Sequence, residues 1–222
     1  MSRFPPRHEA QEFTVFASLL RMTTKYGFSS VRDQLVKDLK GAYPTKWEDF
    51  QSAKVLGEDF FGSPKPHPNA VLNLFEAENV RFAVPFASYR ASIGGFSGLM
   101  SDGHGAVLPR RTLATTVHGM HVLRSSASDA MRMIVYGGSL HVCADEECIL
   151  NVEGKERAVA MERICSTVTG QREGGLLSSP PLEQIICARC ANPVEVAHTT
   201  WGSVVWEKLS PAFNVSHGWD DL

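Results

Sequence analysis

Apolar residues recur at spacings of three and four along most of the chain, which is the repeat of amphipathic helices. The first such stretch covers residues 9–26, and Gly27 follows it as a helix-stopping residue. A second helix follows, and Gly41 and Pro44 end it. Further short helices are predicted over residues 47–56, 70–78 and 82–93. The core-facing residues expected on the first two helices are Phe13, Phe16, Leu19, Leu20, Thr23, Tyr26, Val31, Leu35 and Leu39.

The second half of the chain is also predicted to be helical. Residues 94–105 contain five glycines and are predicted to form a flexible loop. A long helix should run from Pro109 to the Gly137–Gly138 pair, with Ser125–Ser126 as the point where it breaks in two. A last helix opens at Asn192 and runs to about residue 209. No segment alternates apolar and polar residues, so we expect an all-α fold, an irregular multi-helix bundle of about seven to nine helices.

Composition and charge narrow the class of protein. Hydrophobic residues make up 43% of the 222 residues, which is enough to build a core and argues against general disorder. Lys and Arg number 22 against 24 Asp and Glu, so the chain has no excess of positive charge that would favour nucleic-acid binding. No apolar run approaches the roughly 20 residues of a membrane helix, and the opening MSRFPPRHEAQEF lacks a signal-peptide core. We therefore expect an intracellular protein, in the cytoplasm or nucleus.

Cysteines occur only in the C-terminal part, where they form two close pairs. Cys143 and Cys148 make a C-x4-C pair, and Cys187 and Cys190 make a C-x2-C pair. Short-spaced pairs each supply two ligands from one turn, and two pairs complete the tetrahedral shell of a structural zinc. Such a site would tether a small C-terminal helical subdomain. Two unrelated pairs of buried thiols, or a redox or disulfide role, are the alternatives.

Other residues that can ligate metal carry weaker signals. Cys165 falls on an apolar stripe and is expected to pack in the core. His141 and His198 lie near the cysteine pairs, and either could replace a thiolate. His118 and His121 form H-x-x-H without the glutamate of a zinc-protease motif, so we expect an exposed or core-edge pair.

No set of nucleophile, base and orienting group can be assembled from the sequence. Residues 95–99, GFSGL, lack the final glycine of a nucleophile elbow. Asp102 and His104 are two polar residues on a glycine-rich segment with no third group to orient them. Aromatic residues crowd the C-terminus with few basic residues among them, so we expect core packing there and no base-stacking platform. These aromatic residues are Trp201, Trp206, Phe213 and Trp219.

The order of several short motifs resembles a known family. LLRMTTKYGFSSVRDQLVKDL, residues 19–39, resembles the last helix pair of a BTB/POZ domain. The chain after residue 39 is similar to a group of mushroom-type fungal BTB domain proteins. The motifs that carry this similarity are AYPT with WE (residues 42–48), AVLNL (70–74), VPFASY (84–89), the cysteine pairs, and W…LSPAF…W (206–219).

The resemblance implies a division of the chain and a function. A complete BTB domain places its strands and first helices before this point, and only 12 residues precede Phe13. The chain thus resembles the C-terminal part of such a protein: a BTB-like helix pair (9–41), a following helical region (42–138) and a cysteine-containing helical region (139–222). It implies a non-enzymatic protein–protein interaction module with an unknown partner. The alternatives are a small metal-dependent enzyme and a zinc-stabilised nucleic-acid-binding protein.

The same resemblance leads to an expectation about apolar surface. Five residues of the predicted helix pair would pack against the sheet of a complete BTB domain, so here they must find other cover or stay exposed. Large exposed apolar patches promote association, and we expect self-association of the chain. These residues are Phe13, Phe16, Leu20, Val31 and Leu35.

Overall fold

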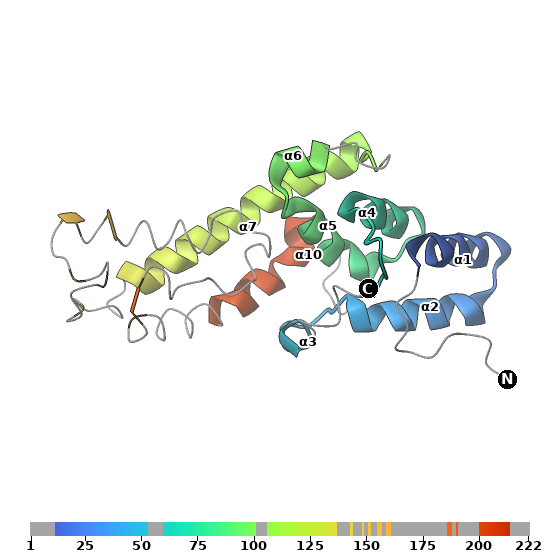
Figure 1. The fold of residues 1–222 in the computed structure, drawn as a ribbon, viewed down its shortest axis with the longest axis horizontal. Coiled ribbons are helices and arrows are strands. Elements are labelled where there is room, and N and C mark those ends of the chain that lie inside the picture. The colour runs from blue at the N-terminus through green and yellow to red at the C-terminus, as the bar shows by residue number, and fades with distance from the viewer. Residues whose placement is uncertain are drawn as a thin grey trace.

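A computed structural model describes residues 12–52, 60–100, 106–136 and 200–213, together with positions 143, 148, 151, 155–156, 159–160, 186–187 and 190. Regular structure in these residues is helical, and no β-strand occurs among them, which confirms the predicted all-α fold (Figure 1). The elements are α1 (Phe13–Tyr26), α2 (Ser29–Ala42), α3 (Trp47–Ser52), α4 (Pro68–Ala77), η1 (Arg81–Ala83), α5 (Val84–Ser92), α6 (Gly95–Met100), α7 (Arg110–Tyr136) and α10 (Leu209–Ala212). Residues 200–207 are also helical.

Helices α1 and α2 form a hairpin closed by Gly27. This glycine takes a left-handed conformation with φ of 70°, and its N–H donates to the carbonyl of Thr23. Phe28 N–H donates to the same carbonyl at 3.0 Å, so two backbone N–H groups share one acceptor in the last turn of α1. A residue with a Cβ is strained at this φ, which is why the predicted glycine stop marks the helix end correctly.

The buried face of the hairpin is covered by Phe60 and Phe61, which lie between α3 and α4, and by residues of α4. Phe16, Leu20 and Leu35 are buried. The rings of Phe60 and Phe61 pack edge-on against Phe16, with centroids 5.7 and 5.5 Å away. The first two helices therefore find cover within the chain on the face that we expected to be unpartnered. The residues of this N-terminal core extend to Leu108.

A second core forms where α3, α5, α7 and residues 200–213 meet. Its residues include Trp47, Phe86 and Trp206. Tyr43 packs against both cores: its ring meets Phe75 at 4.8 Å and Phe86 at 6.0 Å, both edge-on. The two cores are therefore continuous through the end of α2 and through α5, which Figure 1 shows at the centre of the helices.

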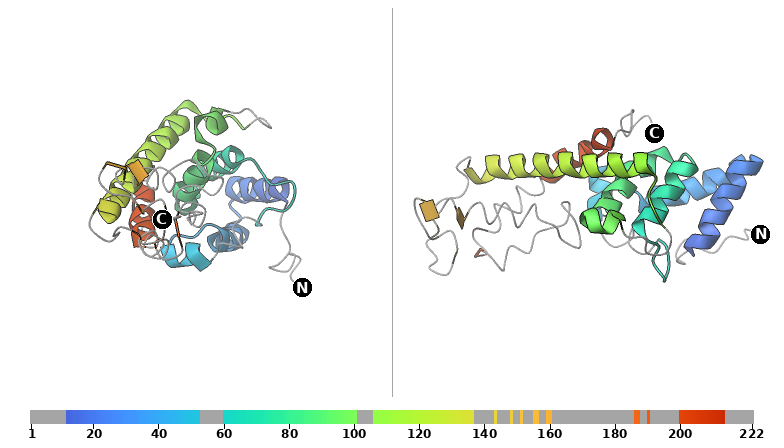
Figure 2. Two further views of the ribbon diagram at one scale, coloured as in Figure 1. Left: turned by 60° about the vertical axis from the view of Figure 1, so that its left-hand side comes forward. Right: turned by 90° about the horizontal axis from the view of Figure 1, so that it is seen from above.

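Helix α7 is one unbroken helix of 27 residues, so the predicted break at Ser125–Ser126 is wrong. Leu123 and Ala127 are buried on either side of this pair, and Lys208 Nζ donates to Ser126 Oγ at 3.3 Å. Burial of this face outweighs the modest helix propensity of serine. Figure 2 shows α7 running along the long axis of the molecule, with α10 alongside it.

The predicted loop at 94–105 is also wrong over its first part, because residues 95–100 form α6. Leu99 is buried, and its carbonyl accepts a 3.2 Å hydrogen bond from Asn69 Nδ2 of α4. This tertiary contact stabilises a short helix that its glycines disfavour. Residues 101–105 lie outside the described residues.

No helix in the described part of the chain has both the length and the apolar character needed to cross a membrane.

Gly119 of α7 allows the C-terminal residues to approach the helix closely. A Cβ built at this position would lie 2.3 Å from Cδ1 of Phe213 and 2.9 Å from the carbonyl oxygen of Ala212. We expect Gly119→Ala to lower the free energy of unfolding by about 1–2 kcal/mol, because overpacking exceeds the roughly 1 kcal/mol gain in helix propensity. Urea unfolding measures the difference.

Gly98 of α6 provides the matched control. A Cβ built there meets nothing within 4 Å, so Gly98→Ala should leave stability unchanged or raise it by up to about 1 kcal/mol. A Gly119→Ala protein as stable as the wild type would contradict the close packing of Phe213 on α7.

Candidate metal centre

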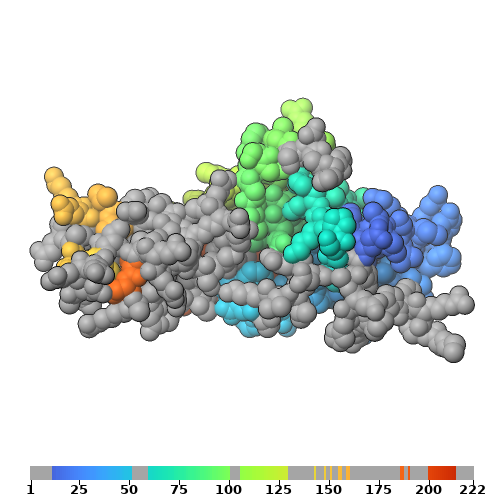
Figure 3. All heavy atoms as spheres, viewed as in Figure 1, coloured from blue at the N-terminus to red at the C-terminus, as the bar shows by residue number. Residues whose placement is uncertain are grey.

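The thiols of four cysteines from two distant segments meet at one point. The Sγ atoms of Cys143, Cys148, Cys187 and Cys190 all lie within 4.8 Å of one another. Among the described residues this is the one group of three or more potential ligands that could hold a metal ion. Figure 3 shows these segments at the end of the molecule opposite α1 and α2.

A local turn brings the thiols of Cys187 and Cys190 together, and another turn begins at Cys148. Cys190 N–H donates to the carbonyl of Cys187 at 3.0 Å, so the C-x2-C segment turns back on itself. Asn151 N–H donates to the carbonyl of Cys148 at 2.8 Å and closes a second turn there. The two turns face each other although 38 residues separate Cys148 from Cys187 in the sequence.

The cluster lies in an apolar environment. Cys143, Cys148 and Cys190 are buried, and Cys187 is half-buried. Ile186 and Ala160 are buried in the same core. Water is therefore largely excluded from the sulfurs, which strengthens the attraction between thiolates and a cation.

The thiols hold one another in the neutral form. Burial raises the pKa of the Cys190 thiol, and hydrogen bonds with the thiols of Cys143 and Cys187 raise it further. The backbone N–H of Cys190 lowers the pKa of Cys187, but desolvation and hydrogen bonds with Cys143 and Cys148 outweigh it and raise that pKa overall. Thiols this close together resist ionisation, because each thiolate would repel the next. A divalent cation bound among them would lower their pKa values and favour the thiolate form.

The geometry fits a four-coordinate ion better than a disulfide. Zn–S bonds of about 2.3 Å place tetrahedral sulfurs about 3.8 Å apart. Cys143 and Cys187 have an Sγ–Sγ distance of 3.5 Å, and the widest separation within the group is 4.8 Å. None of the four cysteines forms a disulfide, and 3.5 Å is far beyond the roughly 2.05 Å of an S–S bond. The four thiols can thus surround one metal ion with small shifts.

No protein-family model, curated protein or solved structure matches this chain.

The other predicted site residues do not join the cluster within the described part of the chain. His118 and His121 are exposed on α7, as expected. Cys165, His141 and His198 lie outside the described residues. Trp219, Asp102 and His104 do too. Trp201, Trp206 and Phe213 are buried in the second core, which confirms the expected core packing of these three C-terminal aromatics.

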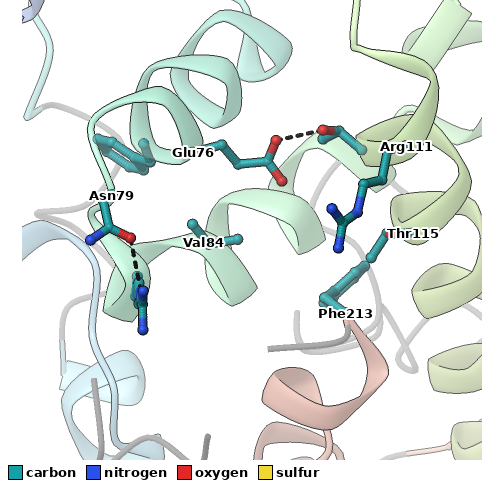
Figure 4. A pocket seen from close by; sticks show the side chains of 9 residues that line it. Glu76, Asn79, Val84, Arg111, Thr115 and Phe213 are labelled. Carbon is teal, nitrogen blue, oxygen red and sulfur yellow. Dashed lines mark hydrogen bonds between the residues drawn. The ribbon is translucent and has the colours of Figure 1, made fainter. Parts of the chain in front are cut away.

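A surface pocket that sequence reasoning missed lies between the end of α4 and the start of α7 (Figure 4). Its volume is about 560 Å³. Thr112 of α7 donates to the Glu76 carboxylate of α4 across it, and Arg81 donates to Asn79 at 2.8 Å. Arg111 points into it. Its walls come from segments far apart in sequence with no shared motif, so only the fold reveals it.

The pocket offers hydrogen bonds and charge, but the carboxylate of its one hydroxyl–carboxylate pair, Thr112 and Glu76, is exposed and has no further hydrogen bond to orient it among the described residues. The residues that line it are Phe75, Glu76, Asn79, Arg81, Val84, Arg111, Thr112, Thr115 and Phe213. The Glu76 carboxylate already accepts from Thr112. The cysteine cluster is therefore the stronger candidate site.

Proposed function

We propose that this chain is a non-enzymatic protein–protein interaction module whose C-terminal part is held together by one structural zinc ion. The observation that carries the proposal is the meeting of the four thiols of Cys143, Cys148, Cys187 and Cys190. The resemblance of its motifs to the C-terminal part of fungal BTB-domain proteins points to the same class of function.

A shell of four thiolates supports a structural metal over a catalytic one. Catalytic zinc keeps one position open for water or substrate, and its protein ligands are mostly histidine or carboxylate. Here four protein sulfurs lie close enough together to supply all four positions of a tetrahedron. Soft thiolate ligands in this geometry favour zinc over the hard cations.

Exposed apolar side chains support an interaction role. Single exposed apolar residues are ordinary, but grouped ones mark interaction sites. Four lie on α1 and the turn after it, namely Val15, Met22, Tyr26 and Phe28. Three more lie on α6 and just before α7, namely Phe96, Met100 and Val107.

Affinity capture with chemical cross-linking tests the interaction role. The full zinc-loaded chain, tagged and mixed with lysate of the cells that make it, should retain a reproducible protein cross-linked to a lysine near one of these groups. An electrophoretic shift assay at moderate salt is the matched test for nucleic acid. Retention of no protein, or a shift of nucleic acid that persists as salt is raised, would contradict the proposal.

A further inference from the structure

Helix α1 has a second apolar stripe that its own chain leaves uncovered in the described structure. Val15, Leu19, Met22 and Tyr26 follow one another at spacings of four, three and four, so they share one side of the helix. Val15, Met22 and Tyr26 are 53%, 52% and 59% exposed, so the prediction that Tyr26 faces the core is wrong, and Leu19 is half-buried against the N-terminal core. Phe28, in the turn after α1, is 55% exposed.

The stripe is separate from the face that α1 buries. Phe16, Leu20 and Thr23 face the N-terminal core, and the stripe lies about a quarter of a turn away from them. In Figure 1 and Figure 2, α1 and α2 lie at the end of the molecule away from the last turns of α7. This position leaves the helix accessible to another molecule.

The charges beside the stripe are arranged so that the helix complements itself. Arg21 and Lys25 lie in the C-terminal half of α1, on the side of the stripe opposite the buried face, which we call the flank. Glu12 lies at its start, and its carboxylate accepts a hydrogen bond from Thr14, which lies on that same flank. A parallel pairing of two such helices would place like charges together. An antiparallel pairing would bring Glu12 of each copy to within about one helical turn of Lys25 of the other.

We propose that the partner of this stripe is a second copy of the chain, with the two α1 helices packed antiparallel about a twofold axis. Val15 of each copy then lies beside Tyr26 of the other, and Leu19 lies beside Met22. A twofold axis requires one patch to complement itself, and the apolar stripe with Glu12 and Lys25 at its opposite ends does so, while the two Arg21 residues lie near the axis on the exposed flank. The inference rests on the proposed function, because it names one partner of the interaction module.

Sedimentation equilibrium of the full zinc-loaded chain tests the pairing. The wild-type protein should pass from one to two chains per particle as its concentration rises, since a patch of this size gives a modest affinity. Met22→Glu buries a charge in the pair and should keep the protein monomeric throughout. Val107→Glu, at an equally exposed apolar residue (66%) outside α1, is the control and should leave the dimer intact. A wild-type monomer at every concentration, or a Met22→Glu dimer, would overturn the proposal.

A charge exchange tests the antiparallel orientation. Lys25→Glu should raise the dimer dissociation constant about 9–25-fold, because the twofold axis removes two exposed ion pairs worth about 3–5-fold each, and adding Glu12→Lys should restore it. No rescue by the double variant would overturn the antiparallel pairing. A wild-type monomer that still captures another protein would contradict this inference alone. A dimer that captures no other protein would contradict the proposed function as tested by affinity capture.

Discussion

Removal of zinc from the chain is expected to lower its melting temperature by about 8–16 °C. A metal that binds only the folded state adds roughly 4 kcal/mol of stability at a thousand times its dissociation constant. Each kcal/mol shifts the melting temperature of a chain of this size by about 2–4 °C. The loss should be large because the thiol cluster joins two segments that 38 residues separate, so metal binding also closes a loop. Calorimetry with and without a chelator measures the change.

Cys187→Ser should reproduce this loss without the chelator. Cys187 is the least buried of the four cysteines, so its replacement by serine removes a ligand at little packing cost. Zinc bound per chain, measured by atomic emission, should fall from one to near zero. Cys165→Ala is the control and should keep one zinc per chain. If neither the chelator nor Cys187→Ser changes the melting temperature, the four residues are simply buried thiols.

Trp206→Ala is expected to lower the free energy of unfolding by about 3–5 kcal/mol, the usual cost of truncating a buried aromatic residue to alanine. The indole is buried among Trp47, Phe50 and Phe86, with ring centroids 6.0, 4.9 and 5.5 Å away. Its Nε1–H also donates to the Thr45 carbonyl at 3.1 Å. Chemical denaturation followed by circular dichroism gives the difference in free energy.

Two further variants separate the contribution of the aromatic ring from that of the hydrogen bond to Thr45 and from the effect of any substitution on this helix. Trp206→Phe keeps an aromatic ring but removes the donor to Thr45, so the loss should be smaller than that of the alanine variant by at least about 1 kcal/mol. Val204→Ala, on the exposed side of the same helix, should change stability by less than about 0.5 kcal/mol. Equal effects of Trp206→Ala and Val204→Ala would show that the second core does not depend on this indole.

The helices of the first half could be predicted because local signals and burial agree there. On α1, Phe16 and Leu20 have helical spacing and are buried, and Gly27 ends the helix. The two errors came from applying local rules where tertiary contacts decide. Burial of Leu123 keeps α7 continuous past its serines, and burial of Leu99 stabilises α6 despite its glycines.

The candidate metal centre could be predicted in part. Short spacing within each cysteine pair indicates two ligands from one turn, and Cys187 and Cys190 do share a turn. Whether the pairs meet depends on how the 38 intervening residues fold, which spacing does not determine. The pocket between Glu76 and Arg111 has no sequence signature, because helix packing alone brings its residues together. The resemblance to fungal BTB-domain proteins stays a prediction.

The two cores differ in when their residues leave the ribosome. The buried residues of the N-terminal core end at Leu108, and Leu113 and Val117 of α7 pack against them, so this core can assemble on the ribosome while the rest of the chain is being made. The second core needs Trp206, whose indole donates to a carbonyl 161 residues earlier in the sequence. Until that residue emerges, Trp47, Phe50 and Phe86 lack the ring that covers them. Synthesis therefore includes an interval in which these three aromatic side chains are not covered by Trp206. Exposed apolar side chains favour chaperone binding and aggregation of the nascent chain during that interval.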